Sequence, residues 1–210
     1  MMRFIPILFA SLSGLFVAQL SAQEWLAYMS TEDGFRVHVP GEFTVTETTW
    51  DSEYGAVMPA RIYLYEDGSG SYKLTVADYT DAYRIHAARD DRTEAENLRV
   101  YWEVDVHASV VYAASLIRER PGRVVYNAYH YIARVPGEQI QMIYPDEFRL
   151  YAAIYLHAGR LYVLEATIPP GAPPPLFYQQ SLGWVDENGD EIRYQNIGDA
   201  PTVVNKPDGR

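Results

Sequence analysis

The chain has 210 residues, a formal net charge of −11, a hydrophobic content of 48% and no cysteine. This composition suits one globular domain with a sizeable core, and its acidity excludes a basic nucleic-acid footprint and disfavours an anionic lipid surface. The lack of cysteine excludes a thiol nucleophile, a thiolate metal site and a lipid anchor on cysteine.

Residues 1–22 have the layout of a secretory signal peptide. Arg3 gives a short positive start, an apolar stretch runs from Phe4 to Val17, and Ala22 precedes a plausible cleavage point. The stretch is short and interrupted for a membrane span, and no later apolar run approaches about 18 residues. We expect a cleaved leader, a periplasmic or secreted location and a mature protein without a stable membrane anchor.

The first part of the mature chain alternates apolar and polar residues, which predicts adjacent antiparallel strands. The strands are expected around Phe35–Val39, Phe43–Thr46, Arg61–Tyr65 and Tyr72–Val76. Residues Asp67–Gly70 are typical of a hairpin turn between the last two.

The period then changes to a helical one. Residues Tyr79–Asn97 mix charges with little apolar periodicity, which indicates an exposed, partly helical connection. A helix is predicted over Val104–Arg118, because the apolar residues at 106, 110, 113 and 117 form one stripe. Pro121 and Gly122 end it.

Strands resume after this helix and are again joined by short turns, which favour antiparallel neighbours. The predicted strands are Arg123–Val135, Gln139–Tyr144, Phe148–His157 and Leu161–Ile168, with turns at Pro136–Gly137 and Ala158–Gly159. A proline-rich spacer (169–175), a short helix (Leu176–Leu182) and an Asn188–Gly189 turn before Ile192–Tyr194 follow. We expect a single α+β domain over residues 23–198, a mostly antiparallel sheet flanked by helices, and a flexible tail over residues 199–210.

Two segments resemble PsbP-like domains. Residues 28–43 read YMSTEDGFRVHVPGEF, similar to the strand–turn segment that opens these domains, and residues 159–182 resemble their closing strand, loop and aromatic helix. The resemblance implies an α/β/α sandwich and a tendency towards non-enzymatic accessory roles. It implies no catalytic, metal or cofactor-binding residue, since the family has no shared catalytic motif.

Two short patterns contain metal-ligand residue types. Glu103 and His107 are four residues apart on the predicted helix, but a helix acid near a solvent-facing histidine is the favoured explanation. Asp186, Asn188 and Asp190 match the start of a calcium loop. The loop then has Glu191 in place of the required glycine, and an Asn-Gly turn accounts for the same residues.

The histidines offer a possible base but no accompanying nucleophile. His38, His130 and His157 lie on predicted strands and could converge across a sheet with an acid. The sequence contains neither G-x-S-x-G nor S-x-x-K, and Ser69 lies in a string typical of a hairpin turn. We therefore predict no catalytic residue.

Aromatic residues are the one surplus that indicates binding. The chain has 18 tyrosines, and those that the predicted strands bring onto the sheet are Tyr126, Tyr129, Tyr131, Tyr151 and Tyr155. Tyrosine packs and hydrogen-bonds at once, but it is also an ordinary strand residue that shields a sheet under a helix. A functional aromatic patch and simple packing both remain open.

Together these features predict an exported, soluble, non-enzymatic accessory or binding protein without a cofactor. Its partner is an unknown protein or a small ligand, and not a nucleic acid. The alternative is a small-molecule or lipid binder with a pocket between sheet and helix, lined by tyrosines and by Trp50, Trp102 and Trp184. A hydrolase with a histidine and a carboxylate in a cleft is the third possibility.

Overall fold

The computed structural model describes residues 25–90 and 98–203. The expected leader, residues 1–22, and the end of the expected tail, residues 204–210, lie outside this part of the chain. In chain order the elements are β1 (Leu26–Ser30), β2 (Phe35–Val39), β3 (Thr44–Asp51), β4 (Val57–Asp67), β5 (Gly70–Asp78), α1 (Ala82–Ala87), α2 (Leu98–Arg118), β6 (Arg123–Ile132), β7 (Val135–Ile143), β8 (Arg149–His157), β9 (Arg160–Ile168), α3 (Leu176–Gln180), β10 (Gly183–Val185) and β11 (Glu191–Ile192).

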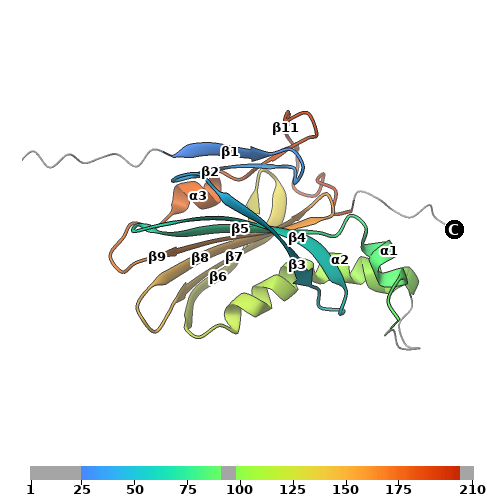
Figure 1. Ribbon diagram of the computed structural model, residues 1–210, viewed down its shortest axis with the longest axis horizontal. Helices are drawn as coiled ribbons and strands as arrows, with labels where there is room; N and C mark the ends of the chain where they lie inside the picture. Colours follow the sequence, from blue (N-terminus) through green and yellow to red (C-terminus); the bar gives the residue numbers. More distant parts are fainter. Residues whose placement is uncertain (1–24, 91–97, 204–210) are drawn as a thin grey trace, which may run out of the picture.

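The strands form two antiparallel sheets. The large sheet has the order β3-β4-β5-β9-β8-β7-β6, and the small sheet has the order β1-β2-β10-β11. Figure 1 shows α2 and α1 on one face of the large sheet and the small sheet with α3 on the other. The predicted α+β class with a mostly antiparallel sheet is confirmed. The sequence did not predict that β2 leaves the large sheet and helps to cover it.

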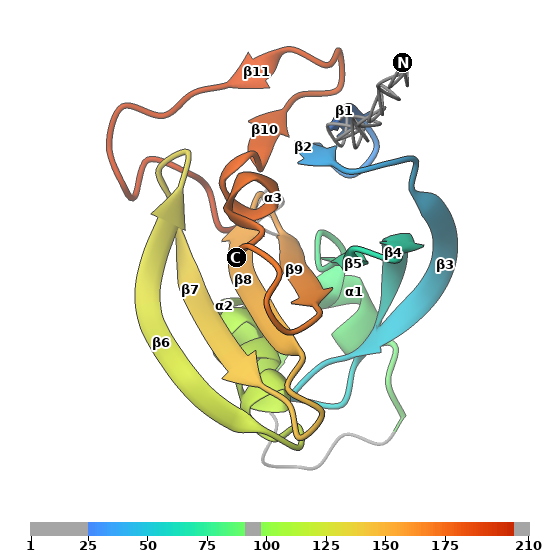
Figure 2. The same ribbon diagram turned by 90° about the vertical axis from the view of Figure 1, so that its left-hand side faces the viewer.

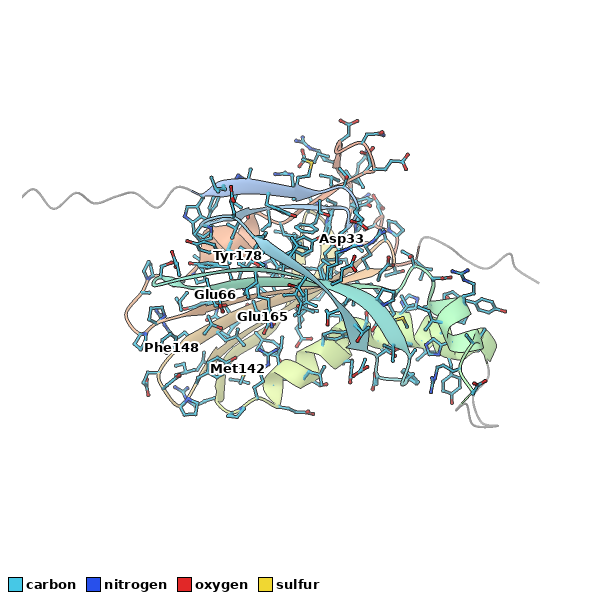
Figure 3. All side chains as sticks on the ribbon, viewed as in Figure 1. Asp33, Glu66, Met142, Phe148, Glu165 and Tyr178 are labelled. Atoms are coloured by element: carbon cyan, nitrogen blue, oxygen red, sulfur yellow. The ribbon has the colours of Figure 1, made fainter. Side chains whose placement is uncertain are left out.

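Each face of the large sheet has its own core. On one face, Val106, Ala113 and Ile117 of α2 are buried against side chains that include Met142, so the predicted helical stripe is confirmed. On the other face the core is aromatic and includes Tyr178 of α3. Figure 3 shows the labelled Met142 and Tyr178 on opposite sides of the large sheet.

An ion pair links the two sheets at the Asp-Gly-Phe segment. Asp33 follows β1 and is only 3% exposed. Its carboxylate accepts hydrogen bonds from Arg61 (2.7 Å) and from the Tyr63 hydroxyl (2.5 Å), both on β4. The Tyr162 hydroxyl of β9 donates to the Asp33 carbonyl at 2.6 Å. The segment that resembles the start of PsbP-like domains thus fixes the small sheet on the large one.

The connection before α2 is partly helical, as predicted, but one side of its described part is buried. Helix α2 begins at Leu98, and α1 occupies part of the preceding segment. Tyr79, Ala82 and His86 are each about 99% buried, because α1 packs against α2 and closes one end of the first core. The remaining residues of that connection, 91–97, lie outside the described chain.

The predicted turn at Pro136–Gly137 is wrong. The β6–β7 chain reversal lies at Ala133 and Arg134, whose φ angles are 45° and 68°, and Pro136 and Gly137 belong to β7. A Cβ atom on Gly137 would lie 2.0 Å from the Ile154 carbonyl oxygen and 2.4 Å from Cδ1 of Tyr155. Glycine is required there for close packing and not for a turn.

We expect an Asn-Gly replacement at the β6–β7 turn to stabilise the protein. Ala133 and Arg134 both adopt left-handed backbone conformations, which cost about 1–2 kcal/mol for an ordinary L-residue. The double substitution Ala133→Asn with Arg134→Gly should raise the free energy of unfolding by about 1 kcal/mol, because this pair suits a type I′ turn. Urea denaturation of the native and variant proteins measures the difference, and a lower urea midpoint would contradict the assignment of the turn.

The other short hairpins follow the prediction. β4 and β5 are joined at residues 68–69, β8 and β9 at Ala158–Gly159, and β10 and β11 by a loop that contains Asn188–Gly189. The β8–β9 turn also holds the start of the tail. Its Ala158 and Gly159 N–H groups donate to the carbonyls of Pro201 and Thr202, each at 2.7 Å. These two bonds connect the start of the expected tail, residues 201–202, to the large sheet.

Candidate binding surface

A groove of about 590 Å³ lies between α2 and the β6–β7 hairpin, and we refer to it as the α2–β6 groove. Val111 on the helix is 62% exposed and Tyr129 on β6 is 66% exposed. The lining residues are His107, Val110, Val111, Asn127, Ala128, Tyr129, Pro136, Gly137, Glu138, Leu156 and Thr202. Apolar atoms therefore form much of a concave surface that is open to solvent.

Two polar residues of the groove, Asn127 and Glu138, are hydrogen-bonded to each other. The Glu138 carboxylate accepts hydrogen bonds from Arg118 and from the Asn127 amide, each at 2.6 Å. These contacts connect the end of α2 to β6 and β7. Because its one acidic side chain is already paired, the groove combines mainly apolar surface with a few hydrogen-bonded polar groups, as binding pockets commonly do.

The five candidate tyrosines do not form one patch. Tyr129 is paired with Glu138 across the β6–β7 ladder and faces α2, and Tyr131 follows at the next position on that face. Tyr151 and Tyr155 lie on the opposite face and are 6% and 0% exposed. Tyr126 is directed to that opposite face, because it lies three residues before Tyr129 in an unbroken part of the strand. Only Tyr129 of the five lines the groove.

The three tryptophans assigned to a common pocket are also separated. Trp50 and Trp102 belong to the core under α2, whereas Trp184 is fully buried in the core under the small sheet. None of them lines the α2–β6 groove. Their role in the structure is packing.

The three candidate histidines make separate contacts and do not converge. Nδ1 of His130 is 2.9 Å from the Tyr155 hydroxyl, and Nε2 of His157 is 2.7 Å from the Tyr194 hydroxyl. His38 lies beside the Phe177 ring of α3, with ring centroids 4.9 Å apart. Within the described chain none of the three is hydrogen-bonded to a carboxylate.

Burial controls the titration of His157. The residue is 2% exposed and its ring stacks on Trp184 with centroids 4.4 Å apart. Burial disfavours the imidazolium, and the nearby Arg160 charge adds to this effect, so the pKa of His157 falls to about 4. The pKa of His130 is also lowered by burial. A neutral His157 is thus part of the core.

The metal-ligand patterns take other roles. His107 lies at the groove on α2, and the described residues contain no group of three or more His, Asp or Glu side chains placed to hold a metal ion. In the loop before β11, the Asp186 carboxylate accepts hydrogen bonds from the N–H groups of Asn188 and Asp190, each at 2.9 Å. These bonds lower the pKa of Asp186 and define a turn. Ser69 likewise hydrogen-bonds to Asp67 within its hairpin turn.

Sequence reasoning missed one buried pair, His86 with Asp105. Nε2 of His86 lies 2.8 Å from Oδ2 of Asp105, and the two side chains are 1% and 0% exposed. This pair joins α1 to α2. The spacing of residues in α2 indicates that Asp105 is buried. Asp105 is four residues before Ser109 and eight before Ala113, so the three share one buried face of the helix.

No family model matches the sequence, and no curated protein matches it. Among solved structures, the chain is similar to cyanobacterial PsbP (CyanoP) from Synechocystis sp. PCC 6803, with 10% identity, coverage of 79% of this chain and 95% of that chain, and a TM-score of 0.45. It is also similar to PA94, a Pseudomonas aeruginosa protein of unknown function, with 9% identity, coverage of 70% and 85%, and a TM-score of 0.30.

The first of these structures is a PsbP protein, the family that residues 28–43 and 159–182 resemble. We argue function only from the chain's own residues. None of the helices in the described ranges is long and apolar enough to cross a membrane.

Proposed function

We propose that this protein is an exported, non-catalytic binding protein that holds an apolar group of its partner in the α2–β6 groove. The groove itself carries the proposal. Val111 and Tyr129 stand on its two walls and are both more than 60% exposed. Exposed apolar surface around a concavity is typical of interaction sites, because removing apolar surface from water lowers the free energy.

The contacts of three of the five histidines support a non-catalytic role. His86 and His157 are buried and hydrogen-bonded within the core. His130 is hydrogen-bonded to the Tyr155 hydroxyl, which is itself buried. A general base has to reach its substrate, and these side chains instead connect elements of the fold.

The proposed export rests on residues 1–22 of the sequence. Arg3, the apolar stretch from Phe4 to Val17 and the small residues that end at Ala22 have the three-part form of a secretory leader. The partner would then be a polypeptide or an apolar molecule of the periplasm or the cell exterior. We propose no cofactor.

A small apolar molecule or lipid is the second candidate occupant. The groove volume, about 590 Å³, falls within the range of roughly 300–1,000 Å³ found for small-molecule pockets. Native mass spectrometry of protein isolated gently from its own compartment separates the two cases. A retained small mass supports the second candidate, and a retained polypeptide supports the first.

A charge on the groove wall should weaken apolar binding. We expect Val111→Glu to reduce the affinity for N-phenyl-1-naphthylamine, a neutral apolar dye, about tenfold, because the dye would displace water from an ionised carboxylate. Fluorescence titration measures the affinity.

Val100→Glu is the matched control for this experiment. Val100 lies on the same helix and is 49% exposed, but it does not line the groove. The control should bind the dye like the native protein. Equal loss of affinity in both variants, or no dye binding by the native protein, would contradict the assignment of the groove. Substrate turnover that disappears when one histidine is replaced by alanine would contradict the non-catalytic role.

A further inference from the structure

Strand β6 is an open edge of the large sheet. Among the described residues its one neighbour in the sheet is β7, and Figure 2 shows it at the outer margin of the molecule. The strand is ten residues long. Apolar and aromatic side chains are exposed along it, namely Val124, Val125, Tyr126, Tyr129 and Tyr131.

This edge carries little of the protection that proteins place on free strands. Charges, prolines and short lengths normally prevent sheet edges from pairing with other chains. Residues 124–132 contain no charged side chain and no proline, and the irregularity at Val125 is the one bulge of the β6–β7 ladder. The opposite edge, β3, carries Glu47 and Asp51.

We propose that β6 pairs with β6 of a second copy of the chain, antiparallel about a two-fold axis at Ala128. This arrangement joins two large sheets into one continuous antiparallel sheet. It closes on itself, because the same surface of each copy is used. The proposal concerns the sheet edge and does not rest on the proposed function of the groove.

The sequence of β6 suits this register. Pairing about Ala128 places Tyr126 opposite His130 of the second copy and Asn127 opposite its Tyr129. Each pair joins residues of one sheet face, since the positions differ by an even number. Beyond the bulge, Val124 would lie opposite Tyr131. Aromatic pairs and aromatic–β-branched pairs are among the cross-strand pairs that stabilise antiparallel sheets.

The distribution of charge favours pairing of two copies at the β6 edge rather than at the β3 edge. A two-fold axis sets equivalent residues close to one another, so a charge near the centre of a strand repels its own copy. β6 has no charge near its centre, whereas Glu47 lies in the middle of β3. Arg123, at the end of β6, would lie opposite Ile132 of the second copy and not opposite another cation.

The two-fold axis runs normal to the joined sheet, which has a structural consequence. Both α2 helices then lie on the same face of that sheet. Tyr129 lines the groove and belongs to β6, so the grooves of the two copies would open next to each other near the axis. A dimer would thus present a paired apolar surface to a partner.

Sedimentation equilibrium of the leader-processed protein tests the dimer. We expect the native protein to have twice the mass of one chain. Ala128→Asp should have the mass of one chain, because it sets two carboxylates opposite each other at the axis. Ala128→Lys should also be monomeric. An equimolar mixture of the two variants should recover the dimer, because aspartate then faces lysine.

Recovery in the mixture excludes misfolding as the cause of dissociation. Thr46→Asp is the control, since it adds the same charge to the exposed edge strand β3 and should leave the dimer intact. A native protein that stays monomeric at all soluble concentrations would overturn the proposal. Dissociation of Thr46→Asp, or a mixture of the Ala128 variants that stays monomeric, would overturn it as well.

Discussion

Replacing Gly137 with alanine should lower the free energy of unfolding by about 3 kcal/mol or more. The new Cβ atom would lie 2.0 Å from the carbonyl oxygen of Ile154 and 2.4 Å from Cδ1 of Tyr155. The carbonyl belongs to β8, an inner strand of the large sheet, and the Tyr155 ring is fully buried. Neither group can move without disturbing strand pairing or core packing.

Urea denaturation measures this effect, and Gly68→Ala is its control. A Cβ atom on Gly68 meets no atom within 4 Å, so that substitution should change stability by no more than about 0.5 kcal/mol. A Gly137→Ala protein as stable as the native one would show that β7 and β8 do not approach each other as described.

Acidification should destabilise the protein through His157, by about 3 kcal/mol between pH 6.5 and pH 4. The pKa of His157 is about 4 in the folded protein, and an unfolded histidine has a pKa of about 6.5. In this window the unfolded chain binds the proton and the folded chain does not, so stability is present above pH 6.5 and falls as the pH falls to 4.

The variant His157→Gln isolates this contribution. It should be less stable than the native protein at pH 7, because the hydrogen bond with Tyr194 and the stacking on Trp184 change. The stability difference between the two proteins should shrink as the pH falls towards 4. Urea midpoints at several pH values measure it. His107→Gln, at an exposed position on α2, is the control. A stability difference that is constant across the window would show that His157 keeps its usual titration in the folded state.

Local patterns predicted most elements of this fold. The helical stripe that includes Val106 and Ile117 gave α2, and alternating residues gave the long strands of the large sheet. Ala158–Gly159 gave a turn, because the backbone preference of glycine acts locally. The same reasoning failed at Pro136–Gly137. Glycine is needed there because the Tyr155 side chain on the neighbouring strand leaves no room for a Cβ atom, and not because the chain turns.

The candidate surface was only partly predictable. The predicted strands were expected to bring tyrosines onto the sheet, and Tyr129 and Tyr131 share one of its faces. Tyr126 is an odd number of residues from both, so alternation along the strand places it on the other face. The groove needs Val111 from α2 beside Tyr129 from β6, and which face of the sheet a helix covers is decided by packing.

The sequence alone indicated an acidic α+β domain with antiparallel strands, because composition and periodicity are properties of neighbouring residues. It also indicated a resemblance to PsbP-like domains and an expected export leader at residues 1–22. Only the tertiary structure decided that β2 joins a separate covering sheet, that His86 meets Asp105, and that β6 remains an open edge beside the groove. These features depend on contacts between distant residues, whose partners the local sequence does not specify.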